Sequence, residues 1–223
     1  FATHSNSNCD FKSAQYLSEL NNPSSIESIN IQPINKEKFQ LNAAKALTEK
    51  TYFILDKYKK GFKASILIKY KFGKCYFPAK IRLHGDLKDH MPMIDGILST
   101  SVRVELKEGN ILNATRFKLL LPKTRNGLNE VLGVLLLKEL GFIVPETFLV
   151  RTSINGIKNN MIFQENPRKE MLERNKRREG PIFEGDDEII MNFKVPMSYK
   201  KDHLFDAKSK IALARLTNKN WFL

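Results

Sequence analysis

The stretch FKASILIKYKFGKCYFPAKIRL, residues 62–83, decides the fold class. In its first half, apolar side chains occupy every second position: Phe62, Ala64, Ile66, Ile68 and Tyr70. A period of two is typical of a strand with one buried face. Gly73 and Lys74 then supply a turn, and the strand pattern resumes from Cys75 to Leu83. The stretch therefore predicts a β-hairpin.

Two further hairpins are predicted downstream. Val102–Leu106 and Phe117–Leu121 form one pair of strand patterns, and Phe148–Ile154 and Lys158–Gln164 form the other. The second pair is joined by Asn155-Gly156, and Asn-Gly is the strongest signal for a two-residue hairpin turn. The sequence therefore predicts an antiparallel β-meander built from hairpins.

One principal helix is predicted between the second and third hairpins. Asn126 can cap its start, and Gly141 ends it. Its apolar stripe consists of Leu128, Val131, Leu132, Leu135 and Leu136. Hairpins packed with one such helix make an α+β layer arrangement, which is the predicted fold class.

The chain is predicted to have three segments. Residues 1–35 are rich in Asn and Ser and are interpreted as a polar leader or linker, residues 36–185 hold the hairpins, and residues 186–223 begin a helical second lobe. A start at Phe1 without Met fits a signal peptide, a membrane anchor upstream or a fragment boundary. The apolar end at Trp221–Leu223 predicts further sequence downstream, so the second lobe is expected to be truncated.

Positive charge is concentrated in one part of the chain. The protein has 37 Lys and Arg against 24 Asp and Glu, a net charge of +13, and +10 of it falls within residues 36–88. A local field of this size steers polyanions or phosphate-bearing ligands, so a non-catalytic module that binds an anionic surface glycan or an acidic protein is one hypothesis. The alternative is that these lysines are solvated positions. No nucleic-acid-binding motif is present, and specific nucleic-acid binding is not expected.

The most unusual cluster is HGDLKDH, residues 84–90, where a strand gives way to a loop. Its two histidines and two aspartates are suitable ligands for zinc or manganese, and a metal-dependent hydrolase would use all four. These are His84, Asp86, Asp89 and His90. Alternatively, Gly85 lets backbone amides approach a phosphate whose charge His84 and Lys88 neutralise. A turn stabilised by the Asp side chains is the third interpretation.

Two carboxylates and two lysines outside this loop are further candidates. Glu165 follows an apolar run, so a carboxylate emerges there from the end of a core strand. Glu139 on the principal helix can pair with Lys80 or Lys118 and position that lysine on a phosphate, as in kinases. The alternative for Glu139 is a solvent-exposed helical charge. No serine- or cysteine-nucleophile motif and no H-E-x-x-H motif is present.

The sequence has two cysteines, Cys9 and Cys75. Their spacing does not match a metal site, and the sequence gives no clear reason to pair them. The redox compartment of the protein is therefore left open.

Several short motifs follow one another in a recognisable order. A strand runs into Arg82-Leu83-His84-Gly85-Asp86, a hairpin ends in Phe117–Leu120, a helix closes on Lys138–Phe142 before Pro145, and the Asn-Gly hairpin leads to Phe163-Gln164-Glu165. This order resembles the N-terminal part of the CotH kinase family, the atypical protein kinases first known from spore coats. The similarity lies in the order and spacing of the motifs.

The resemblance implies a kinase-like N-lobe that binds ATP with Mg²⁺. It implies that His84-Gly85-Asp86 faces the phosphates, that Lys118 or Lys80 contacts the nucleotide, and that Glu165 is a site carboxylate. His84 stands where the family usually has Arg, and the family's catalytic aspartates would lie beyond Leu223, so no catalytic residue is assigned. The resemblance also implies an extracytoplasmic or cell-envelope location and an acidic or surface-associated protein or glycan as substrate.

Overall fold

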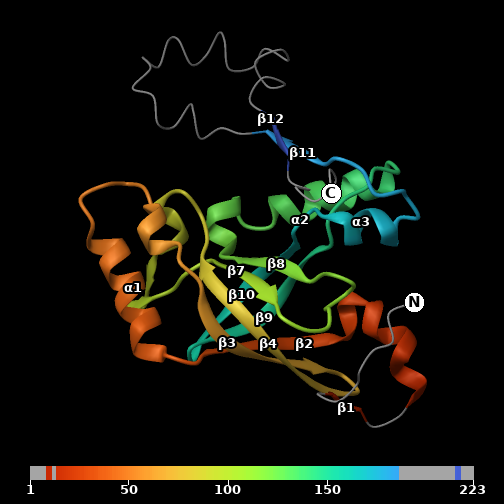
Figure 1. The fold of residues 1–223 in the computed structure, drawn as a ribbon, viewed down its shortest axis with the longest axis horizontal. Helices are drawn as coiled ribbons and strands as arrows, with labels where there is room; N and C mark the ends of the chain where they lie inside the picture. The colour runs from red at the N-terminus through yellow and green to blue at the C-terminus, as the bar shows by residue number, and fades with distance from the viewer. Residues whose placement is uncertain (1–8, 12–13, 186–213, 217–223) are drawn as a thin grey trace. The chain divides into compact units, whose positions relative to one another are not determined.

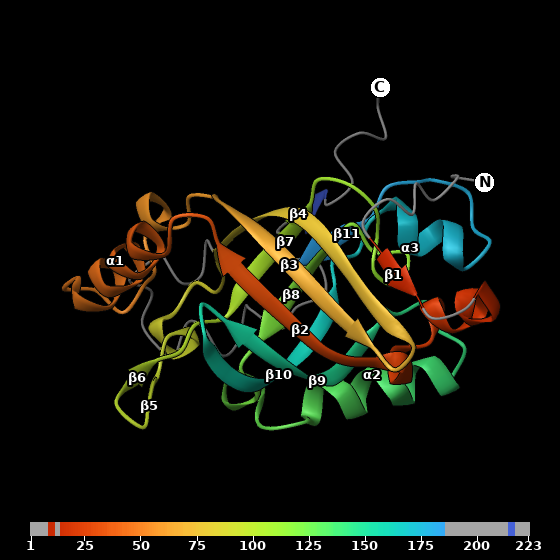
Figure 2. The same cartoon turned by 90° about the horizontal axis from the view of Figure 1, so that it is seen from below.

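The computed structural model describes residues 9–11, 14–185 and 214–216. The chain divides into two compact units, Phe1–Asn166 and Pro167–Leu223. The first unit contains a closed mixed β-barrel (Figures 1 and 2). The described elements of the second unit are a short helix and a two-stranded sheet: α3 (Lys169–Arg174), β11 (Phe183–Gly185) and β12 (Ala214–Leu216).

Seven strands form the barrel: β2 (Ile26–Pro33), β3 (Phe62–Tyr70), β4 (Gly73–Leu83), β7 (Val102–Leu106), β8 (Arg116–Leu120), β9 (Thr147–Ile154) and β10 (Ile157–Glu165). They pair in the order β4-β3-β2-β9-β10-β8-β7, and β7 pairs with β4 to close the ring. β2 and β9 run parallel, and the other neighbours in the ring run antiparallel. Outside the ring, β1 (Cys9–Phe11) pairs with the start of β4, and β5 (Met93–Ile94) pairs with β6 (Ile97–Leu98).

The barrel interior is filled by alternate side chains from all seven strands. On the strands that carry the candidate site, the inward residues include Ile81, Val102, Val104, Phe117 and Leu119, each at most 1% exposed. The aromatic ring of Phe163 stacks between those of Phe117 and Phe148, at centroid distances of 4.7 and 4.8 Å. Residues between these inward positions therefore point to the outer face of the barrel.

The predicted kinase-like α+β lobe is wrong, because the strands close into a barrel. All three predicted hairpins are present, but they do not form a simple meander. β4 pairs with β3 along its length and also with β7 through Ala79–Leu83, while β2 joins β9 in parallel. Pairings such as Ser28 with Arg151 join residues far apart in the chain, and local periodicity cannot reveal them.

Part of the predicted polar leader is a barrel strand. Ile29 and Ile31 of β2 are fully buried, so the linker interpretation of residues 26–33 is wrong. A shift of register between Ile26 and Ser28 interrupts the alternation of the strand, which hides its pattern in the sequence. The predicted helical lobe at 186–223 lies outside the described residues, apart from β12.

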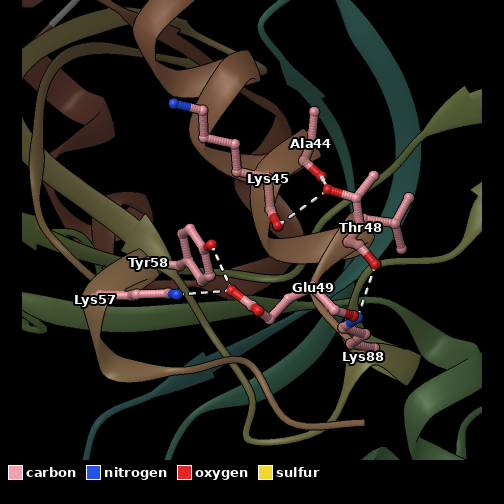
Figure 3. Close-up of polar contacts among 8 residues, drawn as sticks. Ala44, Lys45, Thr48, Glu49, Lys57, Tyr58 and Lys88 are labelled. Carbon is pink, nitrogen blue, oxygen red and sulfur yellow. Dashed lines mark hydrogen bonds and ion pairs between the residues drawn. The ribbon is translucent and has the colours of Figure 1, made fainter. Parts of the chain in front are cut away.

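Helix α1 (Lys36–Thr48) follows β2 and is held at both ends. The Asn35 side chain caps its start by accepting a hydrogen bond from the Lys38 backbone N–H at 2.9 Å. At its other end, Lys88 Nζ donates to the carbonyl oxygens of Leu47, at 2.7 Å, and Glu49 (Figure 3). A cation at this position satisfies carbonyls that have no partner within the helix.

Helix α2 (Asn129–Glu139) is the predicted principal helix, but its apolar stripe is exposed. Leu132 and Leu136 are each 62% exposed, and no residue of α2 is fully buried. Asn126 has a left-handed backbone conformation and does not cap the helix, whereas Gly141 ends it as expected. 3₁₀ helices also occur, at Ala14–Asn21, Pro23–Ser25, Asp56–Tyr58, Lys88–His90 and Pro122–Arg125. No helix in the described part of the chain is long and apolar enough to span a membrane.

Cys9 and Cys75 form a disulfide that joins β1 to β4. The Cys75 side chain is buried in the core, and the two cysteines are separated by 66 positions in the sequence. A cross-link closing a loop of this length stabilises a small domain by about 2–4 kcal/mol. The pairing was not predicted, because it depends on the register of β1 against β4.

Candidate phosphate-binding site

Three cations lie side by side on the outer face of the barrel. The strand registers place Arg82 of β4 opposite Arg103 of β7, and Arg103 opposite Lys118 of β8. All three side chains are half-buried and alternate with core residues of their strands. We call these three residues the cationic row.

The row continues into a polar network that reaches α2. Lys118 Nζ donates to Gln164 Oε1 at 3.4 Å, and Gln164 Nε2 donates to Glu130 Oε1 on the first turn of α2. The other carboxylate oxygen of Glu130 lies 3.5 Å from Arg125 Nε. Gln164 is 7% exposed, so this network is fixed in position beside the row.

His84 lies next to the cationic row, and the positive charges of the row affect the pKa of its imidazole. Burial, acting together with the nearby positive charges of Lys118, Arg103 and Arg125, lowers the pKa of its imidazole to about 2. His84 is therefore neutral at physiological pH. A neutral imidazole offers a phosphate a hydrogen bond but no counter-charge, so a role for His84 beside a phosphate stays a prediction.

His90 packs against His84, with ring centroids 5.5 Å apart. It is 8% exposed, and its Nδ1 has no hydrogen-bond partner among the described residues. Burial lowers the pKa of His90, Arg125 and Lys118 act in the same direction, and Asp89 and Asp86 oppose them. Both imidazoles are therefore neutral groups at the edge of a cationic surface.

Gly85 is required by the packing of the loop. Its φ is +105°, and an added Cβ would overlap the ring of His90. The predicted approach of a phosphate to the Gly85 backbone stays a prediction, and the close neighbour in the structure is the His90 ring.

Two of the predicted loop residues are used within the fold. Asp86 Oδ1 lies 2.7 Å from Lys59 Nζ, and Lys88 holds the end of α1. Lys88 is therefore a positioning residue for a helix, and its predicted phosphate contact stays a prediction. Asp89 is exposed, and within residues 9–11, 14–185 and 214–216 no three His, Cys, Asp or Glu side chains gather as a metal site would need. The structure does not bring together the four ligands predicted for a metal-dependent hydrolase.

The remaining predicted residues lie apart from one another. Lys80 is exposed and lies two positions before Arg82 on β4. It is opposite Lys63 on β3 and opposite Glu105 on β7. Glu139 is exposed at the end of α2, where none of the described ion pairs includes it. The helical carboxylate near Lys118 is Glu130 instead of Glu139.

Glu165 is buried inside the barrel, at 1% exposure. Its Oε2 accepts a hydrogen bond from the Glu146 backbone N–H at 3.0 Å, just before β9 begins. It alternates with Gln164, so the two side chains lie on opposite faces of β10. Of the predicted site residues outside the loop, only Lys118 belongs to the cationic row.

Sequence reasoning did not select Arg82, Arg103, Gln164 and Glu130 as site residues. A usable signal exists, since Arg103 and Lys118 are outward positions of two strands already predicted to pair. The contribution of β4 depends on the closure of the barrel, which has no local signal.

No protein-family model matches the chain, and no curated protein shows a significant match to it. Neither comparison bears on the resemblance to CotH kinases.

Proposed function

We propose that the cationic row binds the phosphates of a nucleoside triphosphate, and that the protein is an ATP-dependent phosphotransferase of the CotH type. The observation that carries the proposal is the alignment of Arg82, Arg103 and Lys118 on adjacent strands. Phosphoryl transfer depends mainly on positioning phosphates and neutralising their charge. A basic surface with a fixed lysine suits that task better than a nucleophile motif would.

The size of the row fits more than one phosphate group. Adjacent strands are about 4.8 Å apart, so three neighbouring cations span about 10 Å. Guanidinium groups offer paired donors that match phosphate oxygens, and a lysine adds a compact charge. His84, which is neutral, adds a hydrogen bond without adding charge.

Gln164 and Glu130 give Lys118 a defined position. In protein kinases a helical glutamate pairs with the nucleotide-contacting lysine. Here Gln164 stands between Lys118 and Glu130, so the helix acts on the lysine through one intermediate side chain. This network would hold the ammonium group over the β4, β7 and β8 surface.

Magnesium and catalytic residues are not assigned. Among the described residues no carboxylate cluster fits a Mg²⁺ ion, so the row is argued for the phosphates alone. When bound with its nucleotide, a magnesium ion would neutralise part of the phosphate charge.

The experiment compares ATP with adenosine as ligands in thermal unfolding of the wild-type protein, Arg103→Met and Lys123→Met. The expected result is that ATP raises the wild-type melting temperature and adenosine does not. Arg103→Met should lose the shift, whereas Lys123→Met, which removes an exposed charge outside the row, should keep it. Transfer of labelled phosphate then tests the phosphotransferase step. Absence of any ATP effect on folded wild-type protein would overturn the proposal.

A further inference from the structure

The β3–β4 hairpin carries positive charge without any compensating carboxylate of its own. Between Phe62 and Leu83 the sequence has six cations and no Asp or Glu: Lys63, Lys69, Lys71, Lys74, Lys80 and Arg82. β3 and β4 run side by side across the face of the barrel that Figure 2 shows. Residues 36–88 carry a net charge of +10. Most of it lies on the β3–β4 hairpin and on residues 49–61 before it, and only a small part lies on helix α1.

Four of these lysines face one another in pairs. The register places Lys63 directly opposite Lys80, and Lys69 directly opposite Lys74, with all four side chains exposed on the outer face. Like charges at opposite positions of an antiparallel pair destabilise the sheet. We call these four residues the lysine ribbon.

Few carboxylates relieve this repulsion. Lys74 lies 3.7 Å from Asp10 Oδ2, and Glu105 lies opposite Lys80 on β7, whereas Lys63 and Lys69 form no ion pair with any described residue. Within each pair the two lysines still face each other directly. A bound polyanion would turn the repulsion into attraction.

The ribbon has a surface suited to an extended ligand. The two lysine pairs lie six positions apart on β3, which corresponds to about 20 Å along the strand. Between them the outer face carries Ser65, Leu67, Tyr76 and Pro78, and the Tyr76 ring is 45% exposed. A strand surface with one aromatic ring between two pairs of cations fits a chain of sugars that bears acidic groups.

We propose that the lysine ribbon binds an acidic polysaccharide. Single-stranded nucleic acids use several aromatic side chains as stacking platforms, and this face exposes one. The Cys9–Cys75 disulfide lies at the start of β4, and structural disulfides persist mainly in oxidising compartments such as the cell exterior. The ribbon shares no residue with the cationic row, although Lys80 lies two positions before Arg82 on β4, so binding of a polysaccharide is measured without nucleotide.

The test measures binding of polygalacturonate and of a size-defined heparin fragment to the whole chain at low ionic strength. Neutral dextran and a single-stranded DNA oligomer of equal charge serve as comparison ligands. One variant replaces Lys63, Lys69, Lys74 and Lys80 with Gln. A matched control variant replaces the same number of exposed lysines on and after α1 with Gln: Lys36, Lys38, Lys45 and Lys50.

The wild-type protein should bind at least one acidic polysaccharide, lose that binding at high salt, and ignore dextran. The ribbon variant should bind about tenfold or more weakly, and the control variant should bind nearly as well as wild type. Equal losses in both variants would show non-specific charge attraction and overturn the proposal. Tighter binding of the DNA oligomer than of either polysaccharide would also overturn it. A thermal melt of each variant confirms that the barrel is folded before binding is compared.

Discussion

The loop at residues 84–90 and the cationic row beside it differ in what their polar side chains contact. In the loop, Asp86 binds Lys59, Lys88 holds the end of α1, and Gly85 accommodates the ring of His90. In the row, cations from three separate strands meet on one outward surface. The sequence of the loop suggests a binding site more strongly, whereas the geometry of the row suits phosphate binding better. The difference teaches that a dense local motif can serve the fold, while strand register builds the site.

The largest effect should come from Gly85→Ala, which tests whether the loop is structural. The positive φ and the overlap with His90 should together cost about 2–4 kcal/mol in the free energy of unfolding. Gly96→Ala is a matched control, because Gly96 also has a positive φ but has open space around its Cβ position. It should cost only about 1 kcal/mol. Denaturant unfolding of both variants checks this, and equal losses would contradict the packing role of Gly85.

A pair of variants compares how much the loop and the cationic row contribute to the free energy of unfolding: Lys88→Met in the loop and Lys118→Met in the row. Lys88→Met removes two charged hydrogen bonds from the end of α1 and should lower the free energy of unfolding by about 1–3 kcal/mol. Lys118→Met removes the 3.4 Å hydrogen bond to Gln164 on a half-buried face and should cost less. Urea unfolding measures both. A larger loss for Lys118→Met would mean that the row is chiefly structural.

His84 should give the protein an acid sensitivity that begins near neutrality. Its pKa is ordinarily 6.5 and is lowered to about 2 in the fold, so between these values the unfolded chain binds a proton that the folded chain does not. The stability of the fold is therefore complete above pH 6.5 and decreases as pH falls, by at most about 1.4 kcal/mol per pH unit for this group.

Unfolding of the wild type and of His84→Gln across this pH range measures the effect. The difference in stability between the two proteins should shift in favour of His84→Gln as the pH decreases. Parallel pH profiles for the two proteins would show that His84 is not held neutral by its surroundings.

The smallest expected effect concerns the facing lysines. Lys63→Glu places a carboxylate opposite Lys80, and should raise the free energy of unfolding by about 0.2–1 kcal/mol. Lys107→Glu, on an exposed position outside the ribbon and next to Glu105, should give no such gain. Thermal melts at low and high salt measure the difference, which should shrink as salt screens the charges. No gain at low salt would mean that the facing lysines do not repel each other appreciably.

The sequence predicted local structure well and long-range pairing poorly. The period of two identified the β3–β4 hairpin, and Asn155-Gly156 identified the turn between β9 and β10. The barrel could not be predicted for two reasons. A register shift interrupts the alternation of apolar residues in β2, and β2 pairs with β9, which is far away in the chain. The Cys9–Cys75 disulfide was missed for the same reason.

The candidate site was predicted in part. Lys118 was identified, since its strand pattern places it outward beside a predicted partner strand. Glu139 was chosen by analogy with a helical glutamate, but only Glu130 lies on the turn of α2 that reaches Gln164. His84 was interpreted as a charge, because the sequence does not show that it is buried among cations.

The most direct test of the central claim is a pair of calorimetric titrations of ATP into Lys118→Met and Lys88→Met. The cationic row predicts that Lys118→Met binds ATP about tenfold or more weakly than wild type. It also predicts that folded Lys88→Met binds ATP as wild type does, since Lys88 is occupied at the end of α1. Loss of binding in Lys88→Met with full binding in Lys118→Met would place the phosphates on the loop and contradict the account.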